Sequence, residues 1–467
     1  TGISCNSKDV KPGFLFVAVK GAKFDGDEFI GEALERGAVA FATSQAHTHS
    51  SFSSATIIIT ENPRKFYSLV LHNYYDRIAS RLKFIGVTGT NGKTTTVYLI
   101  KQMLDKMGLS CGLFSTVKVW NGKNYRMASM TTPDPLMLLE DIKVMVNSGI
   151  EYCVMEVSSH ALDQHRVDFI PFIARAFTNI THDHLDYHGT FINYLNAKKR
   201  FFDAAPPTDT CILNRDDTHF TYMIQNCKGK VLFYSMHYPV DFHMRVLEMN
   251  LNGMVVKIEG RDVVLPFFGI HNGSNALCAY AVCRALGFDK DRVLMALSET
   301  SLPEGRLQRV CSYPPHVFVD YAHTPDAMEK VLKTLAEVKP SGKRLITVFG
   351  CGGNRDKAKR PLMGKIAATY SDYVIITSDN PRDEDPLQII KEIKKGIPQS
   401  ATSKVLCIED RREAIKTALS LAATNDIVAI LGKGHENYQE IKGKKLPFSD
   451  MDVTLELLKN TVQNVIK

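Results

Sequence analysis

The sequence predicts an α/β protein of three domains: a small N-terminal α/β domain, a central P-loop ATPase domain with a parallel sheet, and a C-terminal Rossmann-like domain. Two observations predict this class. Short apolar segments alternate with segments of helical spacing, as in parallel sheets that helices cover. The pattern changes near Phe84 and restarts near Pro303, which divides the 467 residues into lengths typical of domains. We therefore expect domains at residues 1–81, 82–309 and 310–467.

The N-terminal domain is predicted from two apolar strands and one helix. Residues 14–19 read as a strand that ends at a Lys20-Gly21 turn, and residues 38–42 read as a second strand. Helical spacing connects them over residues 29–36. This order is that of a small α/β unit.

The central domain is predicted from strands that alternate with helices. Apolar strands are expected at residues 84–88, 152–155 and 174–180, and an amphipathic helix at residues 94–107. Such alternation favours a mostly parallel sheet with helices on both faces.

The C-terminal domain is predicted from four further apolar strands that helical segments separate. The strands are expected at residues 317–320, 345–350, 373–377 and 427–431. In a doubly wound sheet of this kind, functional loops follow the carboxyl ends of the strands.

A glycine-rich segment at residues 86–95 follows a strand and opens a helix, which is the context that a P-loop requires. Its glycines let backbone N–H groups approach phosphates, and the helix N-terminus adds partial positive charge. Lys93 can reach the β- and γ-phosphates, and the Thr94 hydroxyl can ligate Mg²⁺. The segment therefore predicts a nucleotide site.

The glycine spacing of this segment departs from the usual P-loop pattern. Position 87, where the first glycine belongs, is Val, and the glycines stand at 86, 89 and 92. A glycine-rich turn without a ligand is the alternative, and the Lys-Thr-Thr that follows the last glycine favours the P-loop. The candidate ATP-binding residues of the loop are Gly89, Thr90, Asn91, Gly92, Lys93, Thr94 and Thr95.

Acidic and histidine side chains follow two other strands of the central domain. Glu156 ends one of them, where a carboxylate can hold Mg²⁺ or be an ordinary strand-end charge. The segment 182–188 contains three His and two Asp. Composition alone suggests a transition-metal site there. Mg²⁺ is the more coherent expectation beside a P-loop, because most available ligands are hard oxygens. For His182 and His188, a polar loop that caps a helix is the alternative.

The run Lys198-Lys199-Arg200 lies in a segment of helical spacing. Long basic side chains on a helix usually keep their charges in solvent. From the residues alone, we interpret this run as a solvated helix face.

The bulk properties exclude some classes of protein. A formal charge of +7 is mild for a chain of this length, and no dense basic tract with interleaved aromatic residues suggests nucleic-acid binding. The ten cysteines show no C-x-x-C pair, which favours reduced thiols in the cytoplasm. No apolar run approaches the length of a membrane span, and we see no signal peptide.

Taken together, these segments and several later ones resemble the Mur ligase superfamily, over nearly the whole chain. The motifs that carry the resemblance are Gly89-Thr-Asn-Gly-Lys-Thr-Thr95, Thr131-Thr132-Pro133, Glu156-Val-Ser-Ser-His160 with Gln164-His165-Arg166, Asp183-His-Leu-Asp-Tyr-His-Gly189, His271-Asn272-Gly-Ser-Asn275, Pro303-Glu-Gly-Arg306, Asp320-Tyr-Ala-His-Thr-Pro325, Asp379-Asn-Pro-Arg382 and Gly432-Lys-Gly-His-Glu436.

The resemblance implies a cytoplasmic, ATP- and Mg²⁺-dependent amide-bond ligase of peptidoglycan precursor synthesis. Such an enzyme adds an amino acid to UDP-N-acetylmuramoyl-L-alanyl-D-glutamate through an acyl phosphate and releases ADP. Its partners are small molecules, namely ATP, the UDP-linked dipeptide and the amino acid. A monomer is the expected state, with no nucleic-acid partner and no membrane span.

The resemblance also implies roles at matching positions. Lys198 aligns with the carbamylated lysine of the family, which is an anion and overturns the solvated-face interpretation. The implied catalytic residues are Lys93, Lys198, His184 and Arg306. The implied Mg²⁺ ligands are Thr94, Glu156, His184 and carbamylated Lys198. The further ATP contacts are Asn272, Arg306 and Asp320. The contacts to the UDP-linked dipeptide are Ser7, Thr131, Thr132, Ser158, Gln164 and Arg166.

The segment Asp379-Asn380-Pro381-Arg382 resembles the motif of family members that select meso-diaminopimelate over L-lysine. Diaminopimelate carries a second carboxylate at its distal end, and a planar guanidinium can grip a carboxylate with two hydrogen bonds. Taken alone, the four residues are a common turn sequence. The remaining pocket residues implied by the resemblance are Arg355, Gly432 and Glu436, the last suited to the distal ammonium.

Three other functions compete with this one. Folylpolyglutamate synthetase has a similar P-loop, and a sibling ligase adds D-alanyl-D-alanine. Neither explains the segments 183–188 and 379–382. From a different class, a nucleotide-regulated binding protein would hydrolyse ATP without making a bond.

Overall fold

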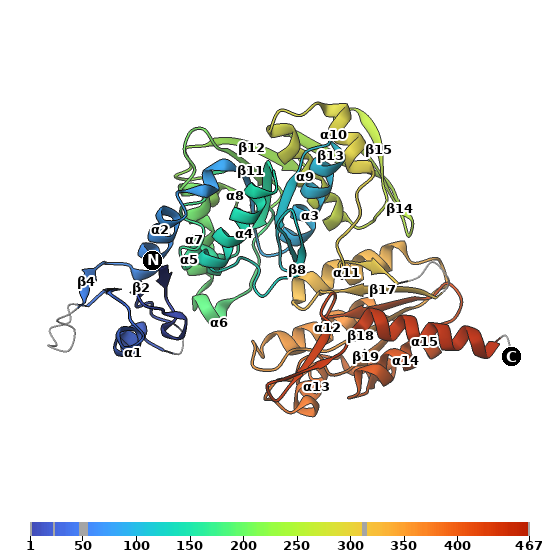
Figure 1. Ribbon diagram of the computed structural model, residues 1–467. Coiled ribbons are helices and arrows are strands. Elements are labelled where there is room, and N and C mark those ends of the chain that lie inside the picture. The colour runs from blue at the N-terminus through green and yellow to red at the C-terminus, as the bar shows by residue number, and fades with distance from the viewer. Residues whose placement is uncertain (1, 22–23, 46–54, 311–314, 466–467) are drawn as a thin grey trace.

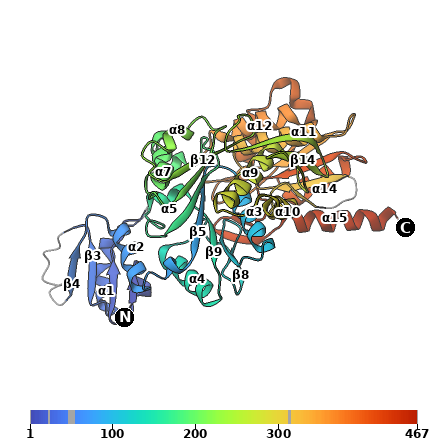
Figure 2. The same ribbon diagram turned by 90° about the horizontal axis from the view of Figure 1, so that it is seen from above.

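The computed structural model describes residues 2–21, 24–45, 55–310 and 315–465. It contains three α/β units, each built on its own sheet, and a separate two-stranded sheet. Figures 1 and 2 show the units in a row, with the N-terminal unit at one end, the C-terminal unit at the other and the central unit between them. The predicted fold class is therefore confirmed, while the domain boundaries at residues 82 and 310 stay predictions.

The N-terminal unit carries one small parallel sheet. Its elements are β1 (Gly2–Ser4), η1 (Ser7–Asp9), β2 (Phe14–Val17), η2 (Gly26–Phe29), α1 (Ile30–Glu35), β3 (Ala40–Thr43), β4 (Thr56–Ile59), α2 (Pro63–Tyr74) and η4 (Ile78–Arg81). The strands run parallel in the order β1-β2-β3-β4. Successive side chains point to opposite faces of a strand. Phe16 and Phe41 therefore pack with Ile30 of α1, while Val17 and Ala42 join a cluster that continues into the central unit.

The central unit carries the largest sheet. Its strands are β5 (Lys83–Thr88), β6 (Cys111–Phe114), β7 (Lys118–Trp120), β8 (Tyr125–Met127), β9 (Tyr152–Glu156), β10 (Phe172–Phe177), β11 (Thr210–Asn214), β12 (Lys230–Ser235), β13 (Phe242–Asn250), β14 (Gly253–Ile258) and β15 (Arg261–Leu265). Its helices are α3 (Lys93–Lys106), α4 (Pro135–Asn147), α5 (Ser159–Asp163), α6 (Leu185–His188), α7 (Phe191–Asp203), α8 (Phe220–Met223), α9 (Ile270–Ala285) and α10 (Lys290–Ser298).

The order of this sheet is β15-β14-β13-β12-β11-β10-β5-β9-β6-β7-β8. The strands from β13 to β6 in that order are parallel, and β5 lies between β10 and β9. Antiparallel strands extend both ends of the sheet. The predicted parallel core is correct, whereas the sequence analysis missed these antiparallel extensions. The strand expected at residues 174–180 lies earlier, as β10, so that residues 178–180 belong to the following loop.

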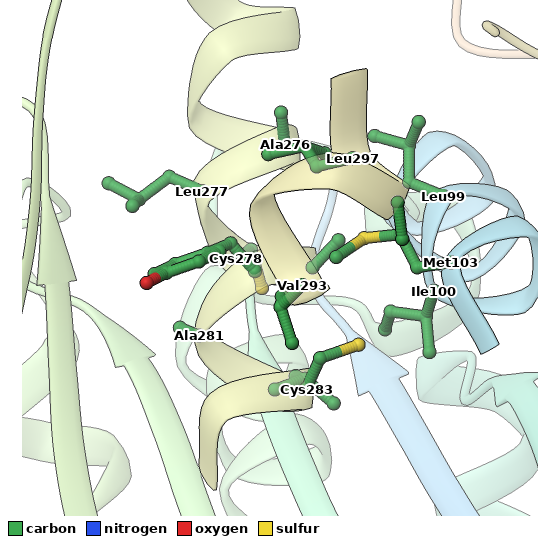
Figure 3. Close-up of a cluster of buried hydrophobic side chains, with 14 of the residues drawn as sticks. Leu99, Ile100, Met103, Ala276, Leu277, Cys278, Ala281, Cys283, Val293 and Leu297 are labelled. Carbon is green, nitrogen blue, oxygen red and sulfur yellow. The ribbon is translucent and has the colours of Figure 1, made fainter. Parts of the chain in front are cut away.

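Helices α3, α9 and α10 cover one face of the central sheet. Figure 3 shows Leu99 and Met103 of α3 on the side of that helix that faces Leu297 and Val293 of α10. Helices α2, α4 and α7 contribute buried side chains to the cluster on the opposite face. Both faces are therefore closed, and only the strand ends are left to carry a site.

Substitution of Leu99 by Ala is expected to lower the free energy of unfolding of the central unit by about 2–5 kcal/mol, because it leaves a cavity in a fully buried cluster. Trp120, the chain's single tryptophan, lies in β7 against this cluster, so its fluorescence in urea reports this unit. Met295→Ala on α10 is the control, since Met295 is 64% exposed. An equal loss in both variants would contradict the assignment of Leu99 to the core.

The C-terminal unit is a doubly wound sheet. Its strands are β16 (Gln308–Arg309), β17 (His316–Asp320), β18 (Leu345–Phe349), β19 (Tyr373–Ile376), β20 (Val405–Cys407), β21 (Ile427–Leu431), β22 (Tyr438–Ile441) and β23 (Lys444–Pro447). Its helices are α11 (Pro325–Val338), α12 (Lys359–Tyr370), α13 (Pro386–Lys394), η5 (Gln399–Lys404), α14 (Arg411–Leu421) and α15 (Asp450–Val465).

The sheet order of this unit is β16-β17-β21-β18-β19-β20, parallel except for β16, and β22 pairs with β23 apart from it. Helices α11, α12 and α13 contribute to the cluster on one face, and α14 and α15 to the cluster on the other. The four predicted strands correspond to β17, β18, β19 and β21. None of the helices in the described parts of the chain has the length and apolar character that a membrane crossing needs.

Candidate active site

Three neighbouring parallel strands bring the predicted nucleotide and metal residues to one edge of the central sheet. β5 pairs with β9 on one side and with β10 on the other. The P-loop follows β5, Glu156 ends β9, and the segment with Asp183 and His184 follows β10. Carboxyl ends of adjacent parallel strands are where α/β proteins bind ligands.

Two glycines of the P-loop are required by its geometry. Gly89 has φ +149° and Gly92 has φ +87°. A Cβ atom at position 89 would lie 1.9 Å from the Thr178 hydroxyl oxygen, and one at position 92 would lie 2.3 Å from the Asn275 side-chain oxygen. The Thr178 hydroxyl donates to the Asn91 carbonyl at 2.6 Å. The loop is therefore held in shape by its neighbours.

The third glycine, Gly86, has a different function. It lies within β5, and a Cβ atom there would come within 2.5 Å of the Phe201 ring. The neighbouring Val87 is fully buried in the core. The unusual glycine spacing therefore arises because Gly86 makes room for an aromatic ring of α7, while Gly89 and Gly92 shape the loop.

Two lysines converge on one carbonyl of the P-loop. Lys93 Nζ donates to the carbonyl oxygens of Gly89 at 2.8 Å and Thr90 at 2.9 Å, and Lys198 Nζ donates to that of Gly89 at 2.8 Å. Burial and the positive charge of Lys93 hold the pKa of Lys198 well below its usual value, against the opposing effect of Asp183. Burial also lowers the pKa of Lys93. Two ammonium groups this close to one oxygen favour an uncharged amine at Lys198.

The solvated-face interpretation of the basic run on α7 is wrong for two of its three residues. Lys198 is 1% exposed, and Lys199 is buried with Nζ 2.5 Å from Asp203. Only Arg200 keeps a largely exposed side chain. The reason is helical spacing: Lys198 lies four residues after Tyr194 and three before Phe201, both of which are buried.

Arg306 reaches the P-loop from the segment that follows the central unit. Its Nη2 donates to the Thr94 hydroxyl at 3.2 Å, and its guanidinium lies 4.7 Å from the centre of the Tyr321 ring. A Cβ atom at Gly305 would lie 2.2 Å from the His435 backbone nitrogen. The segment with Arg306 therefore packs directly on the loop after β21, which carries part of the predicted amino-acid pocket.

The predicted metal residues supply mixed ligands. Glu156 is buried, and its two carboxylate oxygens accept from the backbone N–H (2.7 Å) and the hydroxyl (3.1 Å) of Thr116. Burial lowers the pKa of His184 to about 4, and Asp183 partly opposes this. The ring of His184 is therefore uncharged at neutral pH, as a metal ligand must be.

His182 and His188 make packing contacts around α6 and α7. Within residues 2–21, 24–45, 55–310 and 315–465, no three or more His, Cys, Asp or Glu side chains are grouped as a metal ion would require. His188 donates to or accepts from the Ser159 hydroxyl at 3.0 Å and is buried, so it belongs to the packing of α6. His182 stacks on the Phe191 ring at 4.9 Å. His188 therefore lies within α6 itself, and not in a loop that caps a helix.

Five of the six residues predicted to contact the UDP-linked dipeptide lie together. The Thr132 hydroxyl and Ser158 are 3.2 Å apart, and Arg166 donates to the Thr132 carbonyl at 2.8 Å and to Gln164 Oε1 at 2.6 Å. Thr131 precedes Thr132 in the chain, and its hydroxyl oxygen lies 3.1 Å from that of Thr116.

Ser7 lies apart from this group, in the N-terminal unit, where its hydroxyl donates to Glu32 at 2.7 Å. A hydrogen bond of 3.0 Å between Asn62 and His165 connects the two units. A substrate that touched both Ser7 and the Arg166 group would therefore have to be long and to bridge the units.

Asn272 and Asp320, two of the predicted ATP contacts, form hydrogen bonds within the protein. Asn272 is buried at the start of α9 and donates to the Phe268 carbonyl at 2.9 Å. The Asp320 carboxylate accepts from the backbone N–H groups of Leu307 at 2.5 Å and Ala322 at 2.7 Å. Burial raises the pKa of Asp320. In this conformation Asp320 holds the segment with Arg306 against β17.

The predicted amino-acid pocket joins the loop after β19 to the loop after β21. Asn380 Nδ2 donates to Glu436 Oε2 at 2.8 Å. Gly432 has φ +113°, and a Cβ atom there would lie 2.6 Å from the Asp379 carboxylate. A Cβ atom at Gly353 would lie 1.9 Å from the Pro381 carbonyl oxygen, so the loop that contains Arg355 also packs here.

Arg382 is already engaged on two sides. It has φ +52°, its Nε donates to Glu440 at 3.1 Å, and its Nη1 donates to the Gly353 carbonyl at 2.8 Å. Among the described residues, none accepts a hydrogen bond from Nη2, so this nitrogen is available to a ligand carboxylate. Arg355 is exposed at the rim.

The sequence analysis missed Lys433, Glu440 and Asp326. Asp326 accepts from Asn91 at 2.6 Å and thereby connects α11 to the P-loop. A signal existed for Lys433 only, since glycines stand on both sides of it in a loop that follows a strand. Glu440 and Asp326 are acids in ordinary polar surroundings, and nothing in the sequence distinguishes them.

Family models match all three units of the chain. They are described as the Mur ligase family catalytic domain at residues 1–85, the Mur ligase middle domain at 87–283, and the Mur ligase glutamate ligase domain at 305–434. The chain belongs to the Mur ligase family, whose members are ligases.

Individual relatives show which members of the family this chain is similar to. The UDP-N-acetylmuramoyl-L-alanyl-D-glutamate–2,6-diaminopimelate ligase of Cytophaga hutchinsonii is 44% identical over 459 residues, which are 98% of this chain and 94% of that protein. A solved structure of a ligase with the same name is 32% identical, with a TM-score of 0.70 over 99% of this chain and 95% of its own. The MurF ligase of Thermotoga maritima, solved in complex with ADP, is 19% identical with a TM-score of 0.63 over 99% and 98% of the two chains, a likeness of fold alone.

Proposed function

We propose that this chain is the ligase that adds meso-2,6-diaminopimelate to UDP-N-acetylmuramoyl-L-alanyl-D-glutamate in the cytoplasm, with ATP as the source of energy. One observation carries the proposal: the loops 379–382 and 432–436 contact each other. The second of these loops packs on the segment that brings Arg306 to the P-loop. An amino-acid pocket and a phosphate site are thereby neighbours. The names of the full-length relatives support the same choice.

The reaction needs activation because a carboxylate does not react with an amine at neutral pH. In the proposed first step, the side-chain carboxylate of the D-glutamyl residue attacks the γ-phosphorus of ATP. The bond from that phosphorus to the bridging oxygen breaks, and ADP leaves. Lys93 and Arg306 stabilise the negative charge that develops on the phosphoryl oxygens.

In the proposed second step, the amine of diaminopimelate attacks the acyl phosphate carbonyl. A C–N bond forms, the amine proton is released, and inorganic phosphate leaves from the tetrahedral intermediate. Ligation by this route needs no nucleophilic side chain, and the chain shows no serine or cysteine triad pattern. What the protein contributes is position and charge.

The ligands around the P-loop fit Mg²⁺. The Thr94 hydroxyl in the first turn of α3 and the Glu156 carboxylate at the end of β9 are hard oxygen donors, and Mg²⁺ bound with phosphate uses few protein ligands. When bound, Mg²⁺ supplies positive charge that neutralises phosphate oxygens. We assign Thr94 and Glu156 to one ion and His184 and Lys198 to a second.

The role of Lys198 depends on carbamylation. An uncharged Lys198 amine attacks carbon dioxide, an N–C bond forms, and a proton passes to solvent, which leaves a carbamate anion. The burial of Lys198 beside Lys93 supports this proposal, since it favours the uncharged amine. An anion at this position would relieve the repulsion between the two lysines and could serve as a metal ligand.

The proposed substrate sites follow the three units. The UDP-linked dipeptide would bridge Ser7 of the N-terminal unit and the Arg166 group of the central unit. ATP would occupy the P-loop with Asn272 and Asp320 at its nucleoside end, and diaminopimelate the pocket of the C-terminal unit. We propose that the protein acts as a monomer with small-molecule partners.

An amino-acid panel tests the proposal. The full chain is incubated with ATP, Mg²⁺ and UDP-N-acetylmuramoyl-L-alanyl-D-glutamate, and with one amino acid at a time, and the product mass is read. A product extended by meso-diaminopimelate, and not by L-lysine or L-glutamate, is the expected result. ADP release that no amino acid stimulates, without a ligated product, would instead favour the nucleotide-regulated binding protein. A reaction that persists after Mg²⁺ is chelated would refute the metal assignments.

A further inference from the structure

The loop between β21 and β22 buries a lysine to which the proposed reaction gives no role. Lys433 stands between Gly432 and Gly434, which have φ +113° and +52°. Its side chain is 0% exposed. A Cβ atom at Gly434 would lie 2.7 Å from that of Tyr321, so the loop passes too close to its neighbours for a larger residue. The backbone therefore turns the lysine into the protein.

The Lys433 ammonium completes a triangle of polar groups. Its Nζ donates to Asn380 Oδ1 at 3.0 Å and to Glu436 Oε2 at 3.1 Å, and Asn380 Nδ2 donates to the same Glu436 oxygen at 2.8 Å. Asn380 Oδ1 also accepts from the Glu440 backbone N–H at 3.0 Å. The Asn380 amide is thereby held in one orientation, with its oxygen toward two donors and its nitrogen toward Glu436.

This triangle leaves one carboxylate oxygen for a ligand. Glu436 Oε2 accepts from both Lys433 and Asn380, whereas Oε1 accepts from none of the residues that the structure describes. The Glu436 side chain is 18% exposed, so it is not fully closed off from solvent. A free carboxylate oxygen of fixed direction is a suitable acceptor for an ammonium group.

The charge of Lys433 also matters for Glu436. Burial and the neighbouring Asp379 raise the pKa of Glu436, and Lys433 and Asn380 oppose the rise. Without the lysine, two partly buried acids would face each other with less compensation, and the protonated form of Glu436 would be favoured. A protonated carboxyl group attracts an ammonium group only weakly.

We infer that Lys433 is a positioning residue of the amino-acid pocket, which holds Asn380 and Glu436 so that Glu436 Oε1 receives the distal ammonium of a diamino acid. This inference rests on the proposed function. It adds a determinant of selectivity that does not itself touch the substrate. Lys433 would therefore favour amino acids with a second amine, independently of the carboxylate that Arg382 is proposed to bind.

The test compares Lys433→Met with Lys444→Met in the full chain. Lys444 lies in β23, is exposed, and carries the same charge as Lys433 in the hairpin that follows the Lys433 loop. Initial rates of product formation are measured while ATP, the UDP-linked dipeptide and meso-diaminopimelate are varied in turn. For Lys433→Met, KM for diaminopimelate is expected to rise about tenfold or more, with the other two KM values within about twofold of wild type. Lys444→Met should match wild type.

A substrate analogue makes the test specific. 2-Aminopimelate lacks the distal amine, so the ratio of its kcat/KM in Lys433→Met to that in wild type should stay near one. The double variant Lys433→Met/Glu436→Gln should be no worse with diaminopimelate than Glu436→Gln alone, because both act through one contact. Equal losses for diaminopimelate and 2-aminopimelate, or equal rises in all three KM values, would overturn the inference.

Two further outcomes are separable. If Lys433→Met is not recovered folded, Lys433→Gln provides the same comparison with a polar side chain, and an unchanged KM for diaminopimelate in it would overturn the inference. A wild-type enzyme that ligates diaminopimelate while both Lys433 variants match it would reject the inference alone. A wild-type enzyme that makes no diaminopimelate product would reject the proposed function.

Discussion

Lys198→Ala is expected to lower the rate of ligation by at least about a hundredfold, a loss comparable with removal of one strong electrostatic contact to the transition state. The side chain is buried, and its nitrogen lies 2.8 Å from the Gly89 carbonyl oxygen of the P-loop. Mass spectrometry of the peptide-extended nucleotide measures the rate. Added formate or acetate should restore part of it, because a small carboxylate can enter the space that the side chain leaves.

The adjacent lysine provides the control for this prediction. Lys199 is also buried on α7, but its ammonium pairs with Asp203 of the same helix. Lys199→Ala is expected to keep activity within about threefold of wild type, since an intrahelical pair contributes little. Full activity in Lys198→Ala would remove this lysine from the reaction, and equal losses in both variants would indicate a defect of folding.

Arg382→Ala is expected to raise KM for meso-diaminopimelate about a hundredfold, as the loss of one partner of a hydrogen-bonded charge pair usually does. The poor turnover expected with L-lysine should change far less, because lysine has no distal carboxylate. The discrimination between the two amino acids should therefore collapse. The measurement is kcat/KM for each amino acid at saturating ATP and dipeptide.

Two further variants separate recognition from structure. Arg382 also donates to Glu440 and to the Gly353 carbonyl, so its removal could loosen the pocket. Arg382→Lys keeps the charge but loses the planar fork, and should recover only part of the selectivity. Arg412→Ala removes an exposed arginine of α14 that pairs with Glu456, and it should leave kcat/KM for both amino acids unchanged. Equal losses for lysine and diaminopimelate in Arg382→Ala would contradict a role in selectivity.

The strand ends were predictable because local signals coincide there. An apolar run stops, glycines or acids follow, and a helix begins, as after β5 at Gly89 and after β9 at Glu156. Such positions need no knowledge of distant residues. The gathering of the two at one edge follows from the parallel order of the strands, which the alternation with helices also predicts.

The antiparallel strands were missed although a signal existed. β14 and β15 are joined at Glu259 and Gly260, and β22 and β23 at Lys442 and Gly443, all with positive φ. Two residues of this kind form the tight turn of a β-hairpin.

The orientation of Lys198 could not be predicted from its own segment. A run of three basic residues resembles a solvated face, and only the buried positions Tyr194 and Phe201 indicate which side faces inward. That side approaches the P-loop because α7 follows β10, and β10 pairs with β5, which the P-loop follows. Contacts between residues far apart in sequence, such as Asn91 with Asp326, leave no local trace at all.

Gly305 packs closely on Gly434 and His435, which connects the neighbouring Arg306 rigidly to the loop of the amino-acid pocket. Arg306 and this loop are therefore expected to move together. A movement of the C-terminal unit away from the P-loop would therefore also withdraw Arg306 from Thr94, and the phosphate site would lose one of its cations. Opening of the amino-acid pocket and loss of Arg306 from the phosphate site would then occur together.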